Sequence, residues 1–212
     1  MTETRILPIE IPLFPLGGVI LLPGESLPLN VFEPRYLNMV DDVRRQYDHI
    51  GIIQTVDGSS VGSQPTLAKI GCAGRLEHFE ETDDGRYLIS LRGVSRFELE
   101  EELDARVPYR LAKVSYRNFR QDLEPPTDPE ADRERFIRLL QAWFAQEGMG
   151  LNWDEIGNVP LYAIIDQLAM NAPFSAEEKA RLLVSRDSSA RLLDMEEILA
   201  ARLAGAADGP LN

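Results

Sequence analysis

Residues 11–36 read IPLFPLGGVILLPGESLPLNVFEPRY, and this stretch predicts how the chain begins to fold. Prolines interrupt the apolar segment Ile9–Leu16, and they cannot donate a hydrogen bond to a neighbouring strand. This segment is therefore predicted to be an edge or entering strand. Gly-Gly at 17–18 and Pro-Gly at 23–24 mark turns on either side of a short apolar strand, Val19–Leu22.

The last part of the stretch changes from a strand to a helix. Leu27, Leu29 and Val31 alternate with the residues between them, which is the period of a strand. Pro34 then suits the first turn of a helix, where the N–H that proline lacks would have no partner. From residue 35 to residue 46, apolar side chains recur at helical spacing. This pattern predicts one amphipathic helix of about three turns.

Strand patterns return after this helix. Further strands are predicted in the apolar, β-branched segments 49–56, 69–80, 87–91, 97–99 and 109–116. Asp-Gly at 84–85 supplies the positive φ angles that a tight hairpin needs. Gly71 and Gly74 suggest a bulge or a close backbone approach, and Gly93 is predicted to break its strand. About six or seven strands and one helix are typical of a small closed or half-closed barrel.

The second half of the chain has helical patterns. Residues 121–129 (QDLEPPTDP) contain three prolines, which disfavour regular structure and predict a stiff linker. The helix signals that follow are a cap at Asp128-Pro129, an apolar run over Pro160–Met170, a capping box at Ser175–Glu178 and a last helix ending near Gly205. The predicted division is a β-barrel unit over 1–120, the linker over 121–129, a helical bundle over 130–205 and a frayed tail over 206–212.

The composition argues against several classes of partner. The 212 residues carry 35 acidic and 22 basic side chains, a formal net charge of −13, whereas a general nucleic-acid surface needs an excess of Lys and Arg. Residues 1–120 hold 18 acids and 14 bases (net −4), and residues 121–212 hold 17 and 8 (net −9). A single cysteine fits a reducing compartment, and neither a signal peptide nor a membrane-spanning stretch is apparent. We therefore expect a cytoplasmic protein with no membrane partner.

Residues with catalytic potential are few. His49 and His78 each follow an acidic residue and could serve as a general base, but ordinary strand positions are the favoured interpretation. Cys72 is expected to be a buried small residue. The acidic runs 80–84 and 100–102 are interpreted as a hairpin tip and a strand edge, in preference to calcium or paired-carboxylate sites. With no phosphate-binding loop, C-x-x-C or H-E-x-x-H, we expect no catalytic, metal or cofactor-binding residues.

A family resemblance runs through nearly the whole chain. It is carried, besides the hairpin at 84–85, by residues 11–36, 70–74 (IGCAG), 89–97 (ISLRGVSRF), 174–183 (FSAEEKARLL) and 189–193 (SARLL). These stretches resemble the LON substrate-binding domain, the N-terminal domain of the ATP-dependent Lon protease, also found as a stand-alone bacterial protein. The resemblance implies an α+β fold, a PUA-like β pseudobarrel followed by a C-terminal α-helical bundle. It also implies recognition of protein substrates and a part in oligomer assembly.

The resemblance limits the chemistry that we expect. In the protease, an ATPase domain and a serine–lysine protease domain follow the substrate-binding domain. The chain ends where those domains would begin, and it lacks their nucleotide-binding loop. We therefore expect a protein that is not an enzyme, and the family's catalytic residues have no matching positions to carry over.

The favoured functional hypothesis is a non-catalytic polypeptide-binding or adaptor module, whose partners are unfolded or damaged polypeptides or one protein partner. Its candidate contact residues lie in the loop-like segment 148–156 and are Met149, Leu151, Trp153 and Ile156. Flexible methionine and aromatic side chains suit adaptable peptide contacts. The same side chains could instead cap the helical bundle, and the residues alone favour that interpretation.

RNA binding is the alternative hypothesis, by analogy with other PUA-like domains. A local basic patch could be formed by Arg75, Arg86, Arg92, Arg96, Arg106, Arg110, Arg117 and Arg120. The net charge of −4 in that half opposes this hypothesis. Peptide hydrolysis is the least favoured function, because no catalytic constellation is present in the sequence.

Overall fold

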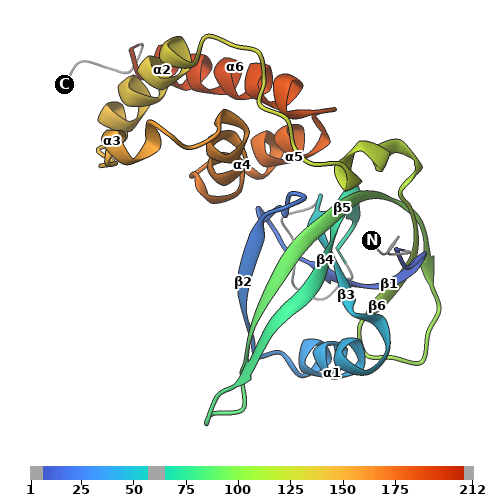
Figure 1. The fold of residues 1–212 in the computed structure, drawn as a ribbon. Coiled ribbons are helices and arrows are strands. Elements are labelled where there is room, and N and C mark those ends of the chain that lie inside the picture. Colours follow the sequence, from blue (N-terminus) through green and yellow to red (C-terminus); the bar gives the residue numbers. More distant parts are fainter. Residues whose placement is uncertain (1–6, 57–64, 208–212) are drawn as a thin grey trace. The chain divides into compact units, whose positions relative to one another are not determined.

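The computed structural model describes residues 7–56 and 65–207 (Figure 1). The chain divides into two units, Met1–Pro125 and Pro126–Asn212, and each is described by itself. The boundary between them falls within the proline-rich stretch 121–129.

The first unit is built on one sheet that curves back on itself. Its strands, among the described residues, are β1 (Glu10–Pro15), β2 (Ser26–Val31), β3 (His49–Thr55), β4 (Leu67–Glu81), β5 (Tyr87–Leu103) and β6 (Arg110–Ser115). They are hydrogen-bonded in the order β2-β5-β4-β3-β1-β6, with β1 parallel to β3 and the other pairs antiparallel. The C-terminal part of β5 also pairs with β6, so the sheet closes into a barrel with β2 at its edge (Figure 1). The predicted α+β class with an N-terminal barrel is confirmed.

One helix connects β2 to β3. It consists of α1 (Pro34–Asp42) and a π-helical turn, η1 (Val43–Tyr47), which together match the predicted helix. Proline occupies its first turn, as expected, and Met39 and Val40 on its buried side are fully covered. Asp48 ends the helix with a left-handed φ of 58° and leads directly into β3.

Residues 19–22 form no strand, contrary to the prediction. Three of their side chains are buried, but the chain then turns at Gly24, whose N–H donates to the Gly93 carbonyl at 2.9 Å. A Cβ atom on Gly93 would lie 2.0 Å from the Leu22 carbonyl oxygen, so this close approach requires glycine. The predicted break at Gly93 is also wrong, because β5 runs through it and absorbs the irregularity as a register shift against β4.

The barrel interior is apolar and closely packed. Its buried cluster consists of Ile11, Leu13, Ile53, Leu67, Ala73, Phe97, Ala112 and Val114. A Cβ atom on Gly71 would lie 2.5 Å from the Phe97 ring, which is the close approach predicted at this glycine. Cys72 is fully buried beside it, as expected of a small core residue.

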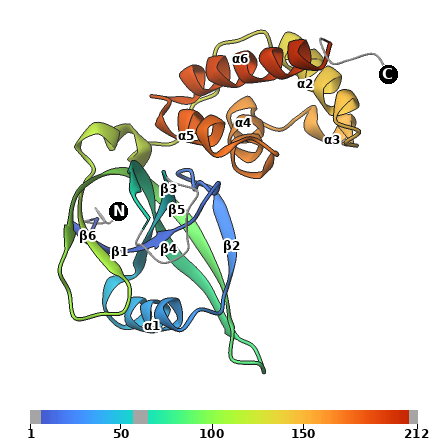
Figure 2. The ribbon, with the colours of Figure 1, turned by 180° about the vertical axis from the view of Figure 1, so that it is seen from behind.

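The second unit is helical. Its described helices are α2 (Arg133–Gln146), α3 (Trp153–Ile156), α4 (Leu161–Asn171), α5 (Ala176–Val184) and α6 (Ser188–Ala207). The long helix α6 packs against α2, α4 and α5 (Figure 2). The core between them contains Phe136, Leu140, Trp143, Ile165, Leu182, Met195 and Leu199. Within the described ranges, no helix has the length and apolar character needed to cross a membrane.

The helix start predicted at Asp128-Pro129 is wrong. Helix α2 is capped instead by Asp132, whose carboxylate accepts the Arg135 N–H. Asp128 accepts the backbone N–H of Tyr162 at 2.9 Å, in the first turn of α4. The N-cap position of α4 is a proline without a side-chain acceptor, so a carboxylate 34 residues earlier satisfies this donor.

Other boundaries differ by a few residues from the predicted ones. The kinked 3-10 helix η2 (Arg117–Leu123) includes the first three residues of the stretch predicted to lack regular structure. The capping box of Ser175 and Glu178 is present with both of its hydrogen bonds. Helix α6 continues to Ala207, past its predicted end, and the rest of the predicted frayed tail, 208–212, lies outside the described residues.

Candidate binding surfaces

The predicted contact segment 148–156 lies between α2 and α4, and its last four residues form α3 where the sequence predicts a loop. Gly148 ends α2 with a φ of +66°, and the Met149 N–H donates to the Phe144 carbonyl at 2.9 Å. Met149 is half-buried, whereas Leu151 exposes 42% of its surface. The segment therefore leaves α2 through a defined turn and presents Leu151 to solvent.

Trp153 and Ile156, the other two predicted residues, are held by α2. The Trp153 ring packs edge-on against Phe144, with 5.4 Å between the ring centroids. The Ile156 carbonyl accepts a hydrogen bond from Arg133 at 2.7 Å. Both side chains are half-buried. The segment thus combines partial packing on the bundle with an exposed apolar side chain.

A second surface, which the sequence analysis missed, lies in the barrel unit. It is a pocket of about 450 Å³ between β6 and η2, called here the β6–η2 pocket. The residues that give it its character are Ile9, Lys113, Tyr116, Arg117, Arg120 and Leu123. They combine apolar, aromatic and basic side chains on an acidic protein.

The helix η2 supplies one side of this pocket. Arg120 and Leu123 follow the kink at Phe119 and are three residues apart, a spacing at which side chains align on a 3-10 helix, and Arg117 precedes the kink. All three line the pocket, although the helix is kinked at Phe119. The spacing is visible in the sequence, but it crosses the boundary between the predicted barrel and the predicted linker, so it was not recognised there.

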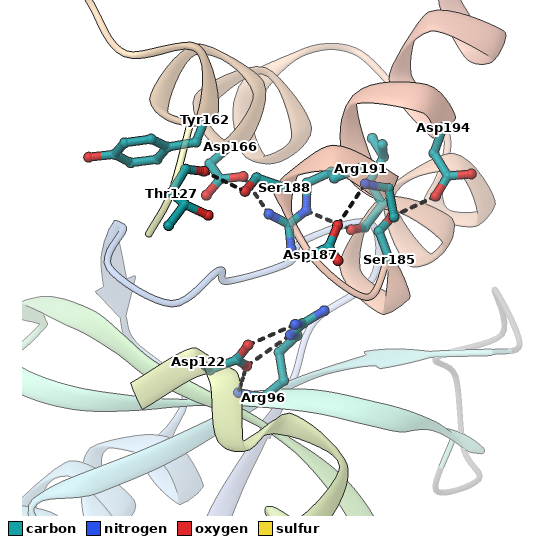
Figure 3. A network of polar contacts seen from close by, with 12 residues as sticks. Arg96, Asp122, Thr127, Tyr162, Asp166, Ser185, Asp187, Ser188, Arg191 and Asp194 are labelled. Carbon is teal, nitrogen blue, oxygen red and sulfur yellow. Dashed lines mark hydrogen bonds and ion pairs between the residues drawn. The ribbon is translucent and has the colours of Figure 1, made fainter. Parts of the chain in front are cut away.

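A buried ion pair anchors η2 to β5. The guanidinium of Arg96 on β5 donates to both carboxylate oxygens of Asp122 on η2, at 2.7 and 2.9 Å (Figure 3). The same guanidinium lies over the Phe119 ring, 4.7 Å from its centroid. These contacts hold the helix in place from its inner side.

The charges at the pocket are predominantly basic. Glu100 lies 3.5 Å from Lys113 and balances it. Arg117 and Arg120 are exposed and form no ion pair with any described residue. Burial raises the pKa of the Tyr116 phenol, which therefore stays protonated and donates to the Pro8 carbonyl at 2.9 Å.

The two histidines occupy ordinary strand positions. His49 is half-buried, and its ring N–H donates to the Tyr47 carbonyl at 3.3 Å. Burial lowers the pKa of His49, opposed by this hydrogen bond and by the charge of Asp48. His78 is exposed near the hairpin, 3.8 Å from Glu80. Across the described ranges, no group of three or more His, Cys, Asp or Glu side chains is arranged to hold a metal ion.

Some carboxylates of the acidic runs are paired with basic side chains. Asp84 at the hairpin tip pairs with Arg86 at 3.0 Å, and Glu102 pairs with Arg110 at 2.5 Å. Four of the arginines considered for RNA binding form an ion pair with a carboxylate: Arg75, Arg86, Arg96 and Arg110. These four contribute little unopposed positive charge.

Buried polar groups of the helical unit hold helices together. Arg191 on α6 donates to Asp166 at 2.6 Å and to the Leu182 carbonyl at 3.0 Å (Figure 3). Lys179 donates to the Met170 carbonyl at 2.8 Å, in the last turn of α4, and burial lowers the pKa of this lysine. Because both cations donate hydrogen bonds to groups of neighbouring helices, we interpret this network as structural.

Residues 10–201 match the family model of the ATP-dependent protease La (LON) substrate-binding domain. The chain belongs to this family. The match extends over both the barrel and the helical unit, and it confirms the resemblance seen in the sequence.

Similar curated proteins are Lon proteases. The chain is 26% identical over 189 residues to the Lon protease of Parabacteroides distasonis, covering 85% of this LON-domain chain and 22% of that protein. It is also 26% identical over 197 residues to the Lon protease of Methylocella silvestris, covering 89% and 24%. The chain therefore spans about a quarter of the length of these relatives.

Solved structures of LON domains share the fold. A Lon N-terminal domain protein from Xanthomonas campestris aligns with a TM-score of 0.62 and 28% identity, over 90% of this chain and 97% of that one. The N-terminal domain of a Lon protease from the Mycobacterium avium complex aligns with a TM-score of 0.61 over 92% and 98%, and its 15% identity makes it evidence of fold alone.

Proposed function

We propose that this LON substrate-binding domain chain binds polypeptides and does not cleave them. The observation that carries the proposal is the family match, which covers residues 10–201 and is to a substrate-binding domain. The partners we propose are unfolded or damaged polypeptides, or one protein partner for which the chain is an adaptor. A cytoplasmic location fits the single cysteine of the sequence, which is buried.

The contact surface we propose is the segment 148–156. An unfolded chain differs from a folded one in its exposed apolar side chains, so its receptor needs an apolar surface that tolerates many sequences. Leu151 is exposed, and the flexible Met149 and the half-buried Trp153 flank it. Methionine and aromatic side chains can repack around different ligands. This combination supports the segment as an adaptable contact.

The direct test is a titration with an unfolded protein. Fluorescently labelled lactalbumin, reduced and carboxymethylated so that it stays unfolded, is titrated with the chain and followed by anisotropy, with native lactalbumin as the control ligand. We expect the unfolded form to bind and the native form not to bind. Leu151→Asp should weaken binding by about tenfold, because a charge replaces an apolar contact. Leu193→Asp, which changes an equally apolar side chain that is 61% exposed on α6, is the matched control.

Three results would contradict parts of this proposal. If unfolded lactalbumin does not bind, the polypeptide-binding function is wrong. If it binds but Leu151→Asp and Leu193→Asp behave alike, the function stands and the segment is not the contact surface. Incubation of the purified chain with casein tests the non-catalytic part, and release of acid-soluble peptides above the buffer rate would contradict it.

A further inference from the structure

The barrel unit offers a site of a different character from the segment 148–156. We propose that the β6–η2 pocket binds a short extended polypeptide segment in which an apolar side chain stands next to one or two carboxylates. This rests on the proposed function only in taking a polypeptide as the ligand. It assigns a separate site and a chemical class of sequence.

The apolar part of the site consists of a buried floor and an exposed rim. Val114 and Phe119 expose only 2% and 7% of their surfaces, whereas Ile9 and Leu123 expose 62% and 58%. Large apolar side chains exposed around one pocket indicate a binding site more strongly than the same side chains scattered over a surface. A pocket of about 450 Å³ accommodates a large apolar side chain with its neighbours.

The polar part of the site is positive. Arg117 and Arg120 are exposed, and Lys113 is already balanced by Glu100. Among the described residues no carboxylate pairs with these two arginines, so they supply positive charge in a chain whose formal net charge is −13. A guanidinium presents a planar fork of donors that matches a carboxylate. The pocket is thus complementary to acidic side chains, although the protein as a whole repels them.

The site is held in shape before any ligand arrives. The Val114 N–H donates to the Ile9 carbonyl at 2.8 Å, which extends the ladder between β1 and β6 to the rim. On the other side, the buried pair of Arg96 and Asp122 fixes η2. Binding therefore has little backbone to order, which favours affinity for a short segment.

A peptide explains these contacts better than a nucleic acid does. Single-stranded RNA is usually bound by open aromatic faces on which bases stack. Phe119 is buried and lies against the Arg96 guanidinium, and Tyr116 is half-buried with its hydroxyl bonded to the Pro8 carbonyl. The exposed rim is aliphatic instead.

The test uses designed peptides and charge-matched variants of the full chain. The acidic probe is a fluorescein-labelled peptide in which Leu and Glu alternate between Gly-Ser ends, and the basic probe carries Lys in place of Glu. We expect the acidic probe to bind, with an affinity that falls as salt rises, and the basic probe not to bind. The double variant R117E/R120E should bind the acidic probe about tenfold or more weakly than the unchanged chain does. The double variant R92E/R106E changes the net charge by the same amount at exposed arginines outside the pocket. Its affinity for the acidic probe should stay within about twofold of that of the unchanged chain.

Several results would overturn the proposal. Equal binding of the two probes, or equal loss of binding in the two double variants, would show that no defined site reads the carboxylates. Displacement of the acidic probe by a lower concentration of an oligouridine RNA would assign the pocket to nucleic acid. Matching thermal unfolding of the two double variants establishes that any difference between them is not a folding defect.

The two proposals can fail separately. If unfolded lactalbumin binds and Leu151→Asp weakens it, while the acidic probe does not bind, the pocket assignment is wrong and the proposed function remains. If the acidic probe binds through Arg117 and Arg120 while unfolded lactalbumin does not bind, the pocket assignment stands and general recognition of unfolded chains is wrong.

Discussion

Arg96 and Asp122 form a buried ion pair with three hydrogen bonds. One carboxylate oxygen accepts from the guanidinium at 2.7 Å, and the other accepts from Nε and from the backbone N–H of Arg96, both at 2.9 Å. The two side chains expose only 2% and 5% of their surfaces. The pair joins β5 to η2 across 26 residues and fixes the helix that carries Arg117 and Arg120.

Asp122→Ala should destabilise the barrel unit by about 3–5 kcal/mol, because it leaves the Arg96 charge buried without its partner. The measurement is the free energy of unfolding from urea denaturation. Glu77→Ala, which breaks the more exposed pair with Arg75, is the control and should cost less than about 1 kcal/mol. Equal losses in the two variants would mean that the buried pair contributes no more to the free energy of unfolding than the exposed pair does.

Gly93→Ala should destabilise the same unit by about 1–3 kcal/mol, because overpacked sites force the backbone to move. The added Cβ would lie 2.0 Å from the Leu22 carbonyl oxygen, and a backbone atom cannot rotate away as a side chain can. Gly17→Ala is the matched control, since its Cβ would meet Thr55 at an ordinary 3.6 Å. Thermal unfolding compares the two, and an equal midpoint would contradict the close approach of β5 to residue 22.

Asp128→Ala should cost the helical unit about 1 kcal/mol, the usual value of a lost N-terminal cap. Its carboxylate accepts the Tyr162 N–H, which the proline at the N-cap of α4 cannot satisfy. Asp128→Asn keeps an acceptor oxygen and should retain most of the stability. The measurement is the free energy of unfolding of the unchanged chain and of the two variants. If Asp128→Ala and Asp128→Asn lower it equally, the hydrogen bond to α4 contributes nothing.

The half-buried His49 should make stability depend on pH. Its folded pKa is lowered by burial, so the unfolded chain binds the proton more tightly than the folded chain. The free energy of unfolding should therefore fall as the pH drops below the ordinary histidine pKa of about 6.5. His49→Gln should remove this part of the fall, measured by urea denaturation at a series of pH values. If His49→Gln leaves the profile unchanged, the buried ring does not contribute to it.

Structure that depends on neighbouring residues was predictable from the sequence. The hairpin expected at Asp84-Gly85 is present between β4 and β5, although of the two residues only Gly85 has a positive φ, +78°. The capping box of Ser175 and Glu178 closes through residues only three apart. In both cases the hydrogen bonds join residues within four positions of each other, so their identity is enough to predict the geometry.

Predictions failed where a distant segment supplied the partner. Residues 19–22 are as apolar as a strand, but they dock against Gly93 without joining a ladder. Asp128 was predicted to cap the helix next to it, yet it caps α4. Any carboxylate in a suitable position can accept a hydrogen bond from the N–H groups at a helix N-terminus, and the sequence does not say which one is near enough.

The two candidate surfaces also differ in whether the sequence alone could reveal them. The segment 148–156 was recognisable because its apolar residues stand together in a loop-like stretch. The β6–η2 pocket joins Ile9 to residues 100–123, which no local pattern connects. Its arginines were counted in the sequence, but four of the eight considered there are paired with carboxylates, and the pairing partners become visible only in the folded barrel.

The sequence alone determined the succession of a strand-rich half and a helical half, the family and the net charge of −13, because these depend on composition and on patterns within a few residues. Only the tertiary structure decided which strands close the barrel, which carboxylate caps α4 and which arginines remain open to a ligand. These depend on contacts between residues that are 26 to 108 positions apart, such as those of Arg96 with Asp122 and of Pro8 with Tyr116. Such contacts depend on how each unit folds around its own apolar core, which residues close in the sequence do not specify.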